Sequence, residues 1–132
     1  MTALYLGATL YMTGLIWFVQ VVHYPLMGRV GRDGFREYEQ AHTRLTTWVV
    51  APPMLIELAT GIAWAFQAPG RASFIGLALI GVIWVSTALF QIPAHRRLER
   101  GFDASAHRRL VTSNWLRTVA WSARAILVTL TL

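Results

Sequence analysis

The stretch that decides the fold is HRRLVTSNWLRTVAWSAR, from His107 to Arg124. Five of its residues follow one another at steps of seven, three, four and three, namely His107, Asn114, Arg117, Trp121 and Arg124. Because these steps match the period of an α-helix, we expect the five side chains to share one helical face. The residues around that face are apolar enough for a bilayer, so the polar face needs polar partners on neighbouring helices.

The composition is that of a membrane protein. Of the 132 residues, 55% are hydrophobic and only 14% are charged, which is too apolar for an ordinary soluble domain. All twelve basic residues are arginine, and they lie between apolar segments. We therefore expect a lipid bilayer as partner and no nucleic acid. The chain has no cysteine, which excludes disulfides, thiolate catalysis and thiolate metal sites.

Four apolar segments predict membrane-spanning helices, at about 2–27, 45–66, 74–98 and 107–131. The first has no acidic residue, lysine or arginine and is long enough to cross a hydrocarbon core of about 30 Å. Segment 29–44 predicts a short interfacial helix, and Pro52 and Pro53 are expected to kink the second span. With short connections, the pattern predicts an all-α, integral membrane, up-down-up-down four-helix bundle that forms a single transmembrane domain over residues 1–132.

The polar residues gather at one end of this predicted bundle. The end of the first helix, the start of the second, the end of the third and the start of the fourth share one side of the membrane. All four histidines and ten of the twelve arginines fall at that end. Because arginine-rich loops stay in the cytoplasm, we expect a multi-pass protein of the cell membrane with both termini outside the cytoplasm.

Three charged residues fall deep inside the predicted spans: Glu57, Arg117 and Arg124. Each costs roughly 2.5–3.5 kcal/mol at a helix centre, so an inward Arg–Glu pair is the natural solution. Two interpretations stay open from the sequence. The residues form a structural ion pair, or they line a functional polar pocket.

The four histidines, His23, His42, His95 and His107, are candidate metal ligands, and three interpretations of them stay open. Glu39 and His42 have the Glu-x-x-His spacing found in metal sites of helix bundles. Histidine and carboxylate suit a non-haem transition metal, whereas His23 with His95 could hold a haem. A third alternative has no metal, and the histidines and carboxylates then pair with the nearby arginines.

The second half of the chain, QIPAHRRLERGFDASAHRRLVTSNWLRTVAW, resembles the anthrone-oxygenase-like family of small four-helix membrane proteins. The matching residues are Pro93, Leu98, Asn114, Trp115, Arg117 and Thr118. The resemblance implies oxidation of flat aromatic substrates with little need of a cofactor. A fainter similarity, from Arg44-Leu45 through Pro53-Met54 to Gly61, links the chain to haem-binding membrane protoporphyrinogen oxidases.

Together these features predict an oxidoreductase with a pocket at the cytoplasmic end of the bundle, acting on a flat aromatic or lipophilic molecule. The candidate catalytic residues are His23, His95, Arg117 and Glu57. The candidate substrate-binding residues are Gln20, Gln91, Asn114 and Trp121. The alternative is a non-catalytic small subunit of a larger membrane complex, and a homo-oligomer is also compatible with the sequence.

Overall fold

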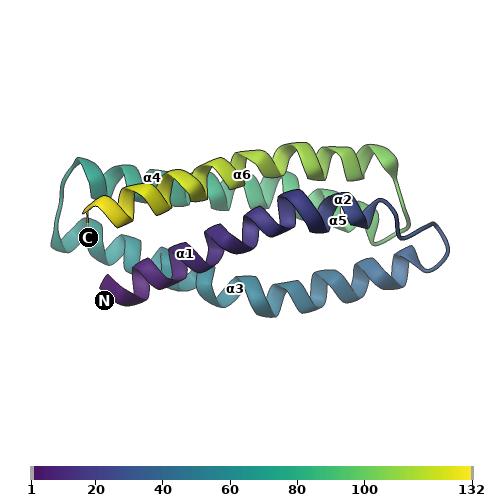
Figure 1. Ribbon diagram of the computed structural model, residues 1–132, viewed down its shortest axis with the longest axis horizontal. Helices are drawn as coiled ribbons and strands as arrows, with labels where there is room; N and C mark the ends of the chain where they lie inside the picture. Colours follow the sequence, from purple (N-terminus) through teal and green to yellow (C-terminus); the bar gives the residue numbers. More distant parts are fainter. Residues whose placement is uncertain (1, 132) are drawn as a thin grey trace.

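The computed structural model describes residues 2–131, which form four helical rods (Figure 1). The first rod comprises α1 (Thr2–Phe18), the π-helical turn η1 (Val19–His23) and α2 (Tyr24–Met27). The second is α3 (Phe35–Gln67). The third comprises α4 (Arg71–Ser86), the π-helical turn η2 (Thr87–Gln91) and α5 (Ile92–Leu98), and the fourth is α6 (Ala104–Thr131). The predicted all-α class is confirmed.

The rods lie side by side, with α1 and α4 each in contact with both α3 and α6. Both chain ends lie at one end of the molecule, and the connections before α3 and before α6 lie at the other (Figure 1). Three rods, Thr2–Met27, Phe35–Gln67 and Arg71–Leu98, are long and apolar enough to cross a membrane. Helix α6 is not among them, and four arginines lie along its length.

Helix α3 begins at Phe35, in the segment that the sequence suggested was a separate interfacial helix. Its first turns are anchored because Phe35 and Glu39 are both fully buried. The Phe35 ring packs in a cluster with residues of α2, α5 and α6. The helix then continues through Pro52 and Pro53 to Gln67. One continuous helix therefore carries both the charged segment and the apolar span.

Each π-helical turn ends two residues before a proline, Pro25 after η1 and Pro93 after η2. Proline has no backbone N–H to donate, so it weakens the regular hydrogen-bond ladder of the preceding turn. A π-helical turn inserts one residue and rotates the next part of the helix, and such turns are frequent at functional sites. Here each turn contains one buried glutamine, Gln20 or Gln91. Each turn thus places one polar side chain in the interior of the molecule.

Candidate metal centre and adjoining cavity

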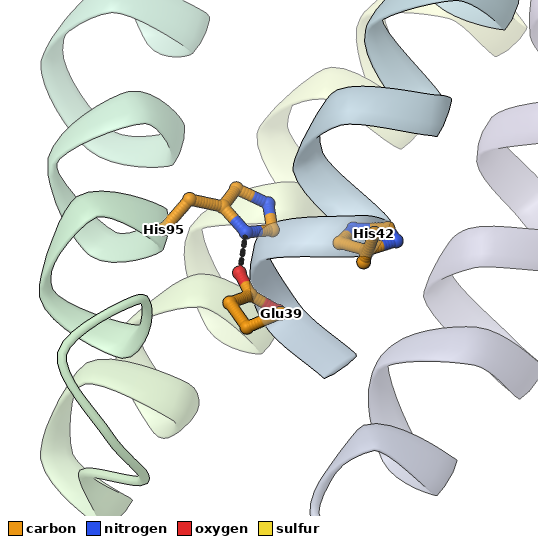
Figure 2. A group of neighbouring side chains, drawn as sticks. All are labelled: Glu39, His42 and His95. Atoms are coloured by element: carbon orange, nitrogen blue, oxygen red, sulfur yellow. Dashed lines mark hydrogen bonds and ion pairs between the residues drawn. The ribbon is translucent and has the colours of Figure 1, made fainter. Parts of the chain in front are cut away.

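Three side chains at the arginine-rich end lie close together: Glu39, His42 and His95, with Glu39 in direct contact with His95 (Figure 2). Each offers one ligand atom, and the three atoms lie within 4.8 Å of one another. Glu39 and His42 are three residues apart on α3, so they project from the same face of that helix. His95 comes from α5, just beyond η2 and Pro93. The predicted Glu-x-x-His pair therefore meets a histidine from another rod.

The carboxylate of Glu39 is fully buried, and only one of its two oxygens has a hydrogen-bond partner among the described residues. Its Oε1 lies 2.5 Å from Nδ1 of His95. Its Oε2 has no hydrogen-bond partner among the described residues. On the other side of the His95 ring, Nε2 lies 3.1 Å from the hydroxyl of Tyr24. His95 is therefore held between a carboxylate and a phenol, and Glu39 keeps one oxygen free for a cation.

His23 and His42 form a second contact beside this group. Nε2 of His23 lies 3.1 Å from Nδ1 of His42, and Thr46 Oγ1 lies 3.0 Å from the same nitrogen. The His42 ring is close to two other imidazoles, with centroids 4.5 Å from His23 and 5.3 Å from His95. A haem held by His23 and His95 would compete with the His42 ring for this space. The geometry favours a single ion over a haem.

The set of two histidines and one carboxylate is a known metal-binding chemistry. Such a set, with open coordination positions, is typical of non-haem iron(II) centres, and it also occurs in catalytic zinc sites. Metal-ligating histidines are commonly oriented by a hydrogen bond to their second nitrogen, and the contact of His95 Nε2 with Tyr24 would be of that kind if Nδ1 bound the ion. The donors present here fit a hard or borderline divalent transition metal.

A cavity of about 420 Å³ adjoins this group, and His42 and His95 both line it. Its inner wall is apolar and is formed mainly by Met12, Ile16 and Met54. Thr47 of α3 and Ile92 of α5 also line it, and both are exposed on the outer surface. The cavity therefore opens sideways between α3 and α5. A volume of this size is in the range of sites for small organic ligands.

Arg117 and Gln91 supply further polar groups to the cavity wall. Arg117 is 7% exposed, and its guanidinium lies over the Trp121 ring at 5.1 Å from the centroid. It also interacts electrostatically with the hydroxyl of Tyr24. Arg117 forms no salt bridge among the described residues. Of the two arginines that the sequence offers as partners of Glu57, Arg117 is therefore not the one that pairs with it.

Glu57 pairs instead with Arg124, at 3.0 Å between Oε1 and Nη2. Its other oxygen accepts a 2.8 Å hydrogen bond from Nε1 of Trp121. Arg124 also donates to the carbonyl of Gly76 and to the hydroxyl of Thr9. None of these residues lines the cavity. Of the two interpretations of the deep charges, the structural ion pair fits Glu57 and Arg124.

Gln20 and Asn114 join each other rather than facing the cavity. Asn114 Nδ2 donates to Gln20 Oε1 at 2.9 Å, and Gln20 Nε2 donates to the carbonyl of Val111 at 3.1 Å. Thr118 also donates to Gln20 Oε1. These buried bonds fasten η1 to α6. Of the four predicted substrate-binding residues, Gln91 alone lines the cavity.

His107 lies apart from the other three histidines. Its Nε2 is 2.7 Å from the backbone carbonyl of Tyr24, and its ring packs beside Phe102. This contact ties the start of α6 to α2. The structure thus brings together His42 and His95, with His23 beside them, and leaves His107 outside the group.

Tyr24 and Thr46 are not among the site residues predicted from the sequence. The signal for Tyr24 was the tyrosine–proline pair at the end of the first helix, where a π-helical turn redirects the side chain. Thr46 lies four residues after His42, which places it on the same helical face.

We compared the chain with protein-family models, with curated proteins and with solved structures, and none of them matches it. The resemblance to the anthrone-oxygenase-like family stays a prediction.

Proposed function

We propose that this chain is a membrane-embedded oxidoreductase that holds one transition-metal ion between Glu39, His42 and His95. Its substrate, a lipophilic or flat aromatic molecule, occupies the adjoining cavity. The observation that supports this function best is that two of the three metal ligands form part of the cavity wall. An ion held by them would lie next to a molecule bound in the cavity.

Iron(II) is the ion we expect, because two histidines and one carboxylate with open positions suit it well. The metal would supply the redox step. The protein's own residues would hold and orient the ligands. With Nδ1 of His95 on the ion beside Glu39, Nε2 of the same ring would keep its contact with the hydroxyl of Tyr24, which also lines the cavity.

The membrane arrangement is part of the same proposal. Helix α6 crosses the membrane as the fourth span of an up-down-up-down bundle, because its polar residues turn inward. Asn114, Arg117 and Arg124 are buried, whereas Val119 and Leu130 are exposed on the outside of the helix. The arginine-rich end faces the cytoplasm, and both termini face away from it. The metal group then lies near the cytoplasmic surface and the cavity within the bilayer.

Nitric oxide tests for an open metal position, since it binds ferrous iron that has a free coordination site. Detergent-purified protein is loaded with iron(II) without oxygen, treated with nitric oxide and measured by electron paramagnetic resonance. We expect a ferrous–nitrosyl signal in the wild type and in His107→Ala, and none in His95→Ala. Bound iron without this signal would indicate a closed structural metal and would contradict the proposed redox role.

A further inference from the structure

The cavity contains a positive charge without a negative partner. Arg117 lies on its wall and is 93% buried, being 7% exposed. Its hydrogen bond to Oδ1 of Asn114 is a long one, at 3.5 Å, its other polar contact is the uncharged hydroxyl of Tyr24, and its Nε has no partner among the described residues. The Trp121 ring beneath it offers a cation–π contact but no hydrogen-bond acceptor.

Arg124, on the same helix face, shows what a paired arginine looks like in this protein. Its terminal nitrogens donate to Glu57, the Gly76 carbonyl and Thr9, although its Nε, like that of Arg117, has no partner among the described residues. It does not line the cavity, whereas Arg117 does. A buried cation in a membrane protein is costly and is normally paired or functional. Arg117 therefore has hydrogen-bonding capacity available for a molecule in the cavity.

The rest of the cavity wall limits the form of that molecule. The side chains of Met12, Met54 and Trp84 line the same cavity and suit an apolar body. Gln91 also lines the cavity, and its Oε1 has no partner among the described residues. Glu99 and Arg96 also line the cavity, and their opposite charges cancel. The positive charge of Arg117 is therefore not balanced by these two residues.

We infer that the cavity binds a lipophilic acid, whose single anionic oxygen group is held by Arg117 and whose apolar body lies against Met12, Met54 and Trp84. Such a molecule would enter from the bilayer through the opening between α3 and α5. The inference names the substrate class of the proposed oxidoreductase and rests on that function only in treating the bound acid as a substrate. Binding itself needs no metal.

The test compares the binding of two carboxylic acids and of the corresponding uncharged alcohols to metal-free protein. The probes are anthracene-2-carboxylate with anthracene-2-methanol, and dodecanoate with dodecanol, at pH 7. Binding is measured for the wild type, Arg117→Met, Arg117→Lys and Arg109→Met. Arg109 is an exposed arginine on α6 and serves as the matched control for uptake of the probes by the detergent. A melting curve for each variant checks that it is folded.

We expect the wild type and Arg109→Met to bind at least one acid about 10- to 100-fold more tightly than its alcohol, the range for a hydrogen bond to a charged group. Arg117→Met should lose this preference, and Arg117→Lys should keep part of it. Equal binding of acid and alcohol to the wild type would overturn the inference. So would an acid preference that survives in folded Arg117→Met. If Arg117→Met does not fold, the wild-type comparison and Arg117→Lys decide.

The metal proposal and this one fail separately. Acid binding by a protein that takes up no metal would contradict the proposed oxidoreductase and leave the lipophilic-acid site standing. Metal binding without a preference for acids would contradict the lipophilic-acid site and leave the proposed oxidoreductase standing.

Discussion

Two groups of buried charged and polar residues lie in this molecule, and they differ in how completely their members are paired. In the first, both oxygens of Glu57 are occupied, by Arg124 and Trp121. In the second, Glu39 keeps one oxygen without a partner, and Arg117 nearby has no salt bridge among the described residues. The first group is closed off from the cavity, and members of the second line it.

The difference teaches how to assign buried charges in a membrane helix bundle. A charge that is costly to bury persists either because its partners compensate it or because it is used. Pairing within the protein accounts for Glu57 and Arg124 without any ligand. It does not account for the free oxygen of Glu39 or for Arg117. Single substitutions can break the two groups one residue at a time.

The largest effect on stability is expected at the closed group. Glu57→Gln leaves Arg124 as a buried charge without a counter-ion, and breaking such a pair costs about 3–5 kcal/mol. We expect the variant to unfold far more easily in detergent, as measured by thermal melting followed by circular dichroism. The double variant Glu57→Gln with Arg124→Gln should recover much of the loss. If the single variant melts like the wild type, the pair is not the structural link described here.

At the open group, the main effect should fall on metal binding. Glu39→Gln removes the carboxylate ligand while keeping the shape of the side chain. Loss of groups around a metal site commonly lowers affinity about 10- to 100-fold, and a direct ligand should cost at least that much. Titration with iron(II) or cobalt(II) followed by absorption measures it. Glu37→Gln, on the exposed side of the same helix, is the control and should bind like the wild type.

The same site should release its metal in acid. Histidine and carboxylate ligands bind a metal only when deprotonated, so protons compete with the ion. We expect affinity to fall steadily as the pH is lowered from 7.5 to 5.5. A metal affinity that does not change over this range would contradict a site that contains two histidines.

Gln20→Ala is expected to lower the stability of the protein without changing its metal affinity, although Gln20 lies in the π-helical turn η1. The change leaves Asn114 and Thr118 without their shared acceptor, Oε1 of Gln20, and an unsatisfied buried group costs about 1–3 kcal/mol. We expect a lower melting temperature and an unchanged metal affinity. A loss of metal at unchanged stability would place Gln20 in the second group after all.

The smallest effect is expected at the start of α6. There Asp103 accepts a 2.8 Å hydrogen bond from the backbone N–H of Ala106 and forms an ion pair with Arg97. These contacts, that of Ala106 first, lower the pKa of Asp103 below its ordinary 3.8. Because the folded-state pKa is lowered, the stabilisation is present above about pH 3.8 and is lost as the pH falls through the lower, folded value.

Asp103→Asn removes the charge but keeps a side chain able to cap the helix. It should melt slightly earlier than the wild type at pH 7, and the two curves should converge as the solution is acidified below pH 3.8. A difference that persists unchanged in strong acid would mean that the charge of Asp103 is not its cause.

The helical class and the polar end of the molecule could be predicted from sequence, because composition and helical spacing carry that information. The pairing of deep charges could not. Arg117 and Arg124 lie seven residues apart on one face, and periodicity alone does not show which of them reaches Glu57. The π-helical turns were also not predicted, because an extra residue within a helix changes side-chain direction without changing composition.

The histidines show the same limit. Spacing identified Glu39 with His42, but it treated all four histidines alike. Whether His95 or His107 completes the group depends on how α5 and α6 begin, and the backbone carbonyl of Tyr24 engages His107. Local sequence carries no signal for a contact between residues so far apart in the chain.

The most direct test of the proposed metal centre is the metal content of the purified protein. The wild type, His95→Ala and His107→Ala are incubated with iron(II), manganese(II) or zinc(II), desalted and analysed for metal per chain. We predict about one ion per chain in the wild type and in His107→Ala, and almost none in His95→Ala. A wild type that retains no metal, or a folded His95→Ala that retains as much as the wild type, would contradict a metal centre formed by Glu39, His42 and His95.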